Sequence, residues 1–289
     1  MSMIMDSYRI RLDSSRDSLT LSPYSVCRVL DGGLVGFDYP KTETKVGKLA
    51  FSDGVSVLRC GFSARELELT FEVTDKLSFK DVRDKVIRLM SSEEDVKITT
   101  YLYGRRRFIT ATPAYPPEFD VNNFHVYPKV RLKLICADPF FAEGSERHLR
   151  LPSAKGMFTF PLNLMDGAGG VMSFADGGFR HRVNNPGDVK CGFRVTVRAA
   201  YGSVTQPMIM LNGQRLQLLE TMSIGDELVF DTRTGEKKIT LNGAVKYSFS
   251  KSDRFFSLEP GENLLTVQSV GDAANIVSDV VFTPLYLGA

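Results

Sequence analysis

The side chains best suited to chemistry are few and widely separated in this chain. It has three histidines and four cysteines, namely His125, His148, His181, Cys27, Cys60, Cys136 and Cys191. The histidines fall in loop-like surroundings and lack the Glu-x-x-His or His-x-x-x-His spacing that places two ligands on one helix face. No Cys-x-x-Cys pair occurs, so neither a zinc site nor a redox motif is supported. We expect no metal site, and we interpret the cysteines as buried free thiols, with disulfides as the alternative.

Other patterns that could support catalysis or cofactor binding are incomplete. Residues 167–170 read GAGG, but they lack a βαβ frame and the Lys-Ser/Thr that follows a phosphate-binding loop. Glu93 and Glu94 stand at the end of a helical segment, where a solvated turn explains them better than an acid/base pair. We therefore predict no catalytic residue, no cofactor-binding residue and no cofactor, and we expect a protein that is not an enzyme.

One basic cluster lies beside aromatic residues. The arginines at 105–107 follow Tyr101, Tyr103 and Gly104, and basic residues among aromatics can stack on nucleic acid. The alternative is a hairpin that turns at Gly104 and carries arginines on an exposed edge, where they prevent wrong strand pairing. We favour the hairpin. A formal net charge of +2 also gives no electrostatic argument for nucleic acid as the main ligand.

The elements that hold these residues are predicted to be mainly strands. A length of 289 residues favours two domains, with one large all-β unit as the alternative. The chain contains 20 Phe, 10 Tyr, 24 Gly and 13 Pro, but no Trp, which is typical of strands broken by tight turns. The first residues turn polar early and the apolar runs are short, so we expect no signal peptide and no membrane span.

Several segments of the first half show the two-residue period of a strand with one buried face. The clearest is RELELTFEV at residues 65–73, where leucine, phenylalanine and valine alternate with glutamate and threonine. The same period returns at residues 96–103, 106–113 and 129–136. The first half is therefore predicted to be a sheet.

A single helix is predicted between the first two of these strands, over residues 78–91. Ser78 followed by Asp81 resembles a capping box, and apolar residues recur at helical spacing after it. Among them, Val82 and Val86 should face the sheet.

The character of the chain changes after about Asp138. A glycine-rich stretch at residues 167–178 makes helix implausible there. We place the boundary between Asp138 and Leu151, which gives an N-terminal domain at 1–145 and a C-terminal domain at 146–289.

The second half is predicted to be an antiparallel sandwich or jelly roll. Strand-like segments are separated by two Asn-Gly pairs, Asn212-Gly213 and Asn242-Gly243. Asn-Gly between alternating segments favours a hairpin, because both central positions of a type I′ turn need positive φ.

Three segments, taken in order, carry a family resemblance. The strand at 129–136 runs into ADPFF at 137–141. Residues 225–247 combine an Asp-Thr strand end, a turn and a strand that reaches an Asn-Gly hairpin. Residues 255–267, FFSLEPGENLLTV, contain an aromatic pair, a leucine and a Pro-Gly turn. Together they resemble the siphovirus-type tail component family, the distal tail proteins of long-tailed, non-contractile bacteriophages.

The resemblance implies a fold and a role. The fold is an N-terminal β-barrel-like domain with one helix, followed by a C-terminal galectin-like β-sandwich. The role is that of a virion structural protein of a phage or prophage, a ring-shaped hub that joins the tail tube to the tail tip or baseplate. The implied partners are further copies of the chain, usually six in all, with the tail tube, tape measure and tail tip or receptor-binding proteins. The implied location is the virion tail, after assembly in the bacterial cytoplasm.

Two further expectations concern interfaces. The N-terminal domain is expected to form the ring, and Glu66, Glu68 and Glu72 of one copy could meet the basic residues 105–107 of the next. The alternative function is a carbohydrate-binding adhesin module for a host-surface glycan, although the lack of tryptophan weakens it. The chain has no room for an inserted carbohydrate-binding module. We therefore expect a neighbouring receptor-binding protein to contact the host, and we expect no membrane or specific nucleic-acid binding.

Overall fold

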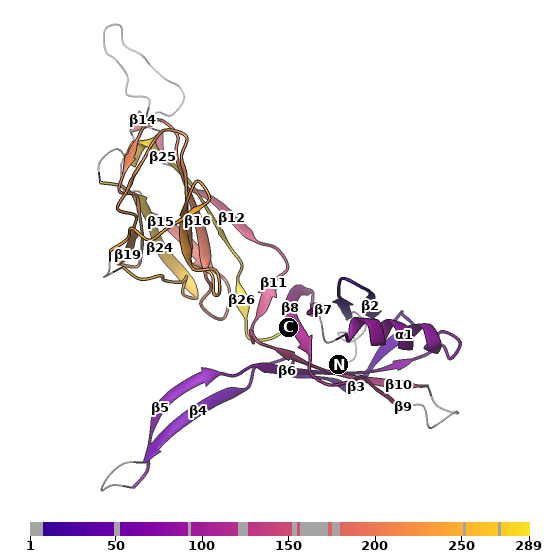
Figure 1. The fold of residues 1–289 in the computed structure, drawn as a ribbon. Helices are drawn as coiled ribbons and strands as arrows, with labels where there is room; N and C mark the ends of the chain where they lie inside the picture. The colour runs from indigo at the N-terminus through magenta and orange to yellow at the C-terminus, as the bar shows by residue number, and fades with distance from the viewer. Residues whose placement is uncertain are drawn as a thin grey trace, which may run out of the picture. The chain divides into compact units, whose positions relative to one another are not determined.

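The structure is a computed structural model that describes residues 8–48, 53–91, 94–120, 127–151, 155–156, 173–174, 180–250, 253–270 and 273–289. The chain forms two compact units (Figure 1). The first unit comprises Met1–Gly144 together with Leu285–Ala289, and the second comprises Ser145–Pro284. Both consist mainly of antiparallel strands, as predicted. His125 and the glycine-rich segment 167–178 lie largely or wholly outside the described residues.

The first unit is built on one antiparallel sheet in the order β2-β1-β7-β8-β10-β6-β3. These strands are β1 (Arg9–Asp13), β2 (Ser18–Leu21), β3 (Cys27–Val35), β6 (Arg65–Val73), β7 (Val96–Leu102), β8 (Arg105–Pro113) and β10 (Lys129–Cys136). Three short strands join them, namely β9 (Glu118–Asp120), β11 (Phe141–Glu143) and β26 (Leu285–Tyr286). No ladder joins β2 to β3 in the described part of the chain, so the barrel implied by the resemblance is not closed.

The predicted alternation of the central strands is confirmed. Strands β6 and β10 pair along their whole length, from Arg65 opposite Cys136 to Glu72 opposite Lys129. Their leucine, phenylalanine and valine side chains are buried in the core of the unit. The hairpin between β7 and β8 turns at Tyr103 and Gly104, which have φ of 52° and 75°.

The predicted helix is α1 (Phe79–Leu89), and its Val82, Val86 and Leu89 are buried. The prediction of a capping box is wrong. Ser78 occupies the N-cap position without a side-chain capping bond, because its hydroxyl donates to the Asp75 carboxylate at 2.6 Å instead.

Strands β4 (Thr42–Lys48) and β5 (Val55–Phe62) form a separate two-stranded sheet in the first unit. Its ribbon extends away from the main sheet of this unit (Figure 1). No strand was predicted over these residues.

The second unit contains two larger antiparallel sheets. One has the order β12-β25-β16-β21-β22-β23, formed by β12 (Arg147–Leu151), β16 (Phe193–Ala199), β21 (Glu227–Asp231), β22 (Lys238–Leu241), β23 (Ala244–Lys246) and β25 (Ile276–Phe282). The other has the order β15-β24-β18-β19, formed by β15 (Arg180–Asn185), β18 (Met208–Leu211), β19 (Gln214–Gln217) and β24 (Gly261–Gln268). Short pairs and a turn complete it: β13 (Lys155–Gly156) with β14 (Ser173–Phe174), β17 (Val204–Thr205) with β20 (Thr221–Met222), and the 3-10 turn η2 (Ala273–Asn275).

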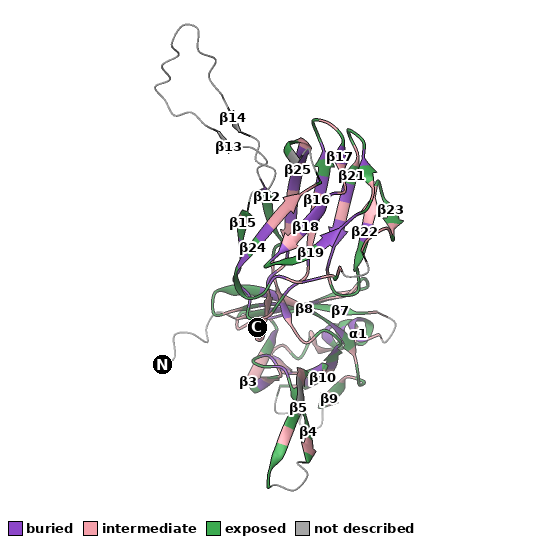
Figure 2. Cartoon of the chain, turned by 90° about the vertical axis from the view of Figure 1, so that its left-hand side faces the viewer, coloured by how far each residue is buried: buried purple, intermediate pink, exposed green. Residues whose placement is uncertain are grey.

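The second unit is a sandwich with buried residues on the strands of both sheets (Figure 2). Both predicted Asn-Gly turns are present. Asn212 and Gly213 have φ of 49° and 87°, and Asn242 and Gly243 have φ of 49° and 81°.

Residues 146–289 were assigned to the C-terminal domain, but Leu285–Ala289 belong to the first unit, because β26 pairs with β11. Cys27, Cys136 and Cys191 are free and buried, as predicted, and the side chain of Cys60 lies outside the described set. Burial raises the pKa of Cys27 to about 11 and those of Cys136 and Cys191 to about 12.

Candidate assembly interface of the first unit

The β4–β5 hairpin exposes several apolar side chains to solvent. Val46, Val55 and Val57 are 55%, 56% and 64% exposed. Val46 lies opposite Val57 in the ladder, so two of these side chains come from neighbouring strands. An isolated two-stranded hairpin is marginally stable in water, because it cannot bury enough apolar area by itself. The hairpin is therefore a candidate contact surface.

The hairpin is twisted and has charged side chains along its strands. Its register shifts between Lys45 and Val46, and such a bulge increases the local twist. Lys45 and Lys48 are exposed on β4. Lysines and bulges both discourage unspecific pairing of a free strand edge, so the hairpin is suited to one specific partner rather than to aggregation.

An aromatic cluster holds the base of the hairpin. Tyr39 and Phe62 have ring centroids 5.9 Å apart, and Phe62 and Phe140 have centroids 5.4 Å apart, both in edge-to-face geometry. Edge-to-face pairs stabilise by about 0.5–1.5 kcal/mol beyond the burial of area. These ring contacts connect the end of β5 to the residues just before β4 and just before β11.

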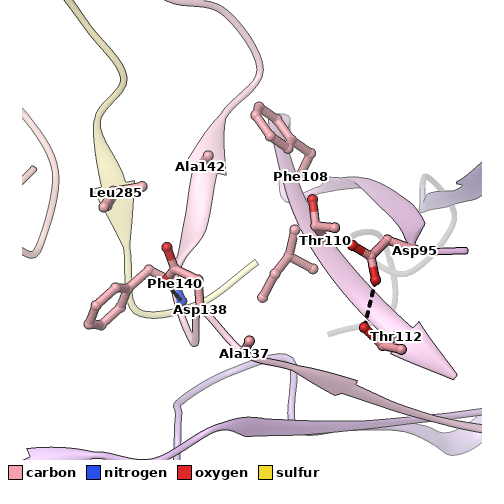
Figure 3. A pocket seen from close by; sticks show the side chains of 10 residues that line it. Asp95, Phe108, Thr110, Thr112, Ala137, Asp138, Phe140, Ala142 and Leu285 are labelled. Carbon is pink, nitrogen blue, oxygen red and sulfur yellow. Dashed lines mark hydrogen bonds between the residues drawn. The ribbon is translucent and has the colours of Figure 1, made fainter. Parts of the chain in front are cut away.

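Phe140 also lines a pocket of about 270 Å³ beside β8 (Figure 3). The carboxylate of Asp95 accepts a hydrogen bond from the Thr112 hydroxyl at 2.6 Å. Asp138 accepts one from the Phe140 N–H at 3.1 Å, and burial raises the pKa of its carboxyl. The lining supplies hydrogen-bond acceptors and apolar surface, but its residues include no histidine, cysteine or lysine. Within the described chain no three potential metal ligands gather at one point.

The predicted arginine edge at 105–107 is only partly correct. Arg105 and Arg106 are exposed, and Arg106 lies over the Tyr101 ring, 5.5 Å from its centroid. Arg107 is buried, and its guanidinium lies over the ring of Tyr286. β8 is not an edge strand, because β7 pairs with one side of it and β10 and β11 pair with the other.

The acidic face of β6 is partly neutralised within the same chain. Glu68 pairs with Arg131 of β10 at 3.1 Å, and Arg131 also contacts Glu118 at 3.4 Å. Sequence reasoning missed these pairs, although the ladder places Glu68 next to Lys133 and diagonal to Arg131. Glu66 is exposed and Glu72 is half-buried.

The two described histidines lie in strands rather than in the loops that were expected. His148 belongs to β12, with its Nε2 3.8 Å from the Glu146 carboxylate. His181 belongs to β15, and burial lowers its pKa.

Comparison with known proteins gives one family match and one match of fold. Residues 186–286 match the family model of the siphovirus-type tail component, C-terminal domain. The fold matches the crystal structure of the SPP1 Dit (gp 19.1) protein, described as a paradigm of the hub adsorption apparatus in phages that infect Gram-positive bacteria. That match has a TM-score of 0.67 at 17% identity, and it covers 97% of this chain and 100% of that one. The family resemblance predicted from the sequence is thereby confirmed.

Weaker matches were also found. Two structures of the phage P2 baseplate in its activated conformation, with Ca and with Sr, give TM-scores of 0.47 and 0.46 at 7% and 8% identity. Each covers 96% of this chain and 98% of the other. No curated protein matches the chain. No helix in the described residues is both long and apolar enough to cross a membrane.

Proposed function

We propose that the chain is a structural hub of a siphovirus tail, a ring that joins the tail tube to the tail tip or baseplate. The observation that carries the proposal is the match of residues 186–286 to the siphovirus-type tail component domain. The fold shared with the SPP1 Dit protein over both units supports it. The protein acts in this proposal by holding surfaces together and not by catalysis. No comparison favours the carbohydrate-binding alternative.

The ring is proposed to contain six copies, with the first unit as its body. In a closed ring each copy uses two different patches, and a stable contact buries on the order of 1,200 Å² or more. The β4–β5 hairpin supports this arrangement, because it offers a projecting apolar patch that a neighbouring copy could cover. The tail tube, tape measure and tip proteins are the proposed partners in the virion tail.

Light scattering on the full-length protein tests the ring directly. We expect the mass to approach six chains as the concentration rises, and electron micrographs to show rings with an axial opening. Particles that stay monomeric at high concentration would contradict the proposal.

A pair of variants tests the hairpin as the contact. Val57→Asp places a charge on an exposed position of the hairpin, so it should spare the fold. It should weaken assembly by at least about tenfold, because an unpaired charge would be buried in the interface. The matched control is Ile224→Asp, a 67% exposed position in the second unit, which should assemble normally. Normal assembly of Val57→Asp, or loss of assembly in Ile224→Asp, would overturn the role of the hairpin.

A further inference from the structure

Residues 285–289 lie in the first unit as an added strand from the far end of the chain. Tyr286 pairs with Phe141 and Leu285 pairs with Ala142, so β26 runs antiparallel to β11. β11 in turn pairs with β8 of the main sheet. An extended segment added to the edge of a sheet is a common way in which proteins bind peptides.

A buried arginine of the first unit binds the backbone of this segment. Arg65 is 1% exposed, and its guanidinium donates to the carbonyl oxygens of Gly36, at 2.9 Å, and of Leu287. The guanidinium also lies 4.8 Å from the ring centroid of Phe141. No ion pair of Arg65 exists among the described residues. A buried charge is costly unless it is hydrogen-bonded, and the carbonyl of Leu287 is one of three that accept from Arg65, with those of Gly36 and Phe37.

A second arginine binds the next peptide unit. Arg107 is 7% exposed and donates to the carbonyl oxygen of Gly288 at 2.5 Å. Its guanidinium carbon lies 3.8 Å from the ring centroid of Tyr286, a cation–π contact. Two guanidinium groups from different strands therefore hold the carbonyls of two successive residues.

Position 288 has no space for a side chain. A Cβ atom on Gly288 would lie 2.4 Å from the carbonyl oxygen of Asp38, a backbone atom that cannot swing aside. The Ala289 N–H donates to the carbonyl oxygen of Phe37 at 2.9 Å. The contacts thus select an aromatic residue at 286 and glycine at 288.

We propose that the first unit contains a peptide-binding groove, and that residues 285–289 are its ligand, a clasp that can open and be replaced by a free peptide of the same sequence. The groove is formed by β11, Arg65, Arg107 and the backbone of residues 36–38. It recognises an extended segment with an aromatic residue two positions before a glycine. This inference is independent of the hub proposal, because it concerns only contacts within one chain.

The buried thiols provide a test in the full-length protein. Cys136 is fully buried and lies opposite Arg65 in the β10–β6 ladder, so we expect it to become more accessible when the contact between Arg65 and Leu287 is lost. Cys27, opposite Val73 at the other end of β6, reports opening of the rest of the first unit, and Cys191 reports the second unit. Alkylation by iodoacetamide, followed site by site with mass spectrometry, measures all three rates.

Gly288→Ala should open the clasp selectively. We expect Cys136 to react at least about tenfold faster than in the unchanged protein, with Cys27 and Cys191 within about twofold, as for a local opening. Tyr286→Ala, which removes the ring under Arg107 without a clash, is a second variant with the same expected pattern. The matched control is Gly202→Ala in the second unit, where the nearest atoms belong to the side chain of Asn275. That control should leave Cys136 unchanged.

Rescue by peptide separates a binding groove from a merely structural contact. A synthetic peptide TPLYLGA, with the sequence of residues 283–289, should slow Cys136 alkylation in the Gly288→Ala protein. The same peptide carrying Gly288→Ala should not. The proposal would be overturned by an unchanged Cys136 rate in the variants, by equal acceleration of all three thiols, or by a peptide that gives no protection.

Discussion

The two units are both antiparallel β structures, but they are completed in different ways. Every strand of the second unit comes from one continuous stretch, Ser145–Pro284. The first unit takes its last strand, β26, from the opposite end of the chain. A cut at the boundary predicted from the sequence, after residue 145, would therefore remove part of the first unit while leaving the second intact. Assembly and stability are better tested with point variants in the full chain than with two halves.

The two units also differ in the groups that surround a buried charged side chain. In the second unit the buried carboxylate of Asp231 accepts a hydrogen bond from Arg233 at 2.6 Å and lies 3.5 Å from Arg194. In the first unit the buried Arg65 is bound by backbone carbonyls, and burial lowers its pKa. Asp231 is stabilised by the positive charges of two arginines, whereas Arg65 is stabilised by hydrogen bonds to backbone carbonyls. The stability of the first unit should therefore depend more on where its segments lie.

The largest expected effect is on the helix of the first unit. Val86 is fully buried, so Val86→Asp places an unpaired charge in the core and should cost about 3–5 kcal/mol. Ile87→Asp, at the neighbouring position that is 44% exposed, is the control and should cost little. In a melting curve with two transitions, only the transition of the first unit should be lost. Loss of both transitions would show that the units do not unfold separately.

This difference between the units also explains what the sequence could and could not predict. Strands β6 and β10 and the turn at Gly104 follow local rules, namely a period of two and a positive φ, so they were found at the right residues. The β4–β5 hairpin was missed because every residue of β4 except Gly47 is exposed, which removes the alternation on which the prediction depends.

The contacts of the clasp could not be found from local pattern at all. Arg65 opens β6 on the same face as the buried Leu67 and Leu69, so the period of two places it inward, but spacing along the strand does not indicate which groups bind its guanidinium. One of those groups is the carbonyl of Leu287, 222 positions away. The need for glycine at 288 likewise depends on the carbonyl of Asp38. Such information is stored in tertiary contacts and not in spacing along the chain.

Asp231 and Asp138 should respond to pH with opposite signs. Burial by itself raises the pKa of Asp231, but the hydrogen bonds and charge of Arg233, with the charge of Arg194, lower it overall. Its contribution to the second unit is present above the unfolded pKa, about 3.9, and is lost as the pH falls through the lowered value. For Asp138, burial raises the pKa. Its contribution to the first unit is present at low pH and is lost as the pH rises through the raised value.

Replacement of each aspartate by asparagine isolates these contributions. Asp231→Asn should destabilise the second unit by about 1.5–3 kcal/mol at pH 7, because it breaks hydrogen bonds to a charged group. The difference should shrink below about pH 4. Asp138→Asn should leave the first unit equally stable or more stable at pH 7. Calorimetry between pH 7 and pH 3 resolves both transitions. A destabilising Asp138→Asn would show that the hydrogen bond from the Phe140 N–H to the ionised carboxylate outweighs the cost of its desolvation.

The smallest effect is expected on the acidic face of β6, and it decides between two kinds of contact in the proposed ring. Glu68 and Arg131 form a surface pair with side chains 33% and 47% exposed, so Glu68→Gln should cost less than about 1 kcal/mol. If copies associate through the apolar β4–β5 hairpin, Glu68→Gln and Glu66→Gln should leave assembly unchanged, whereas Val57→Asp weakens it. If instead the glutamates of one copy meet Arg105 and Arg106 of the next, the glutamate variants should weaken assembly, and more so at low salt, where surface charges interact most strongly. Light scattering of the three variants at two salt concentrations distinguishes the cases, because an apolar contact loses little strength when salt is added.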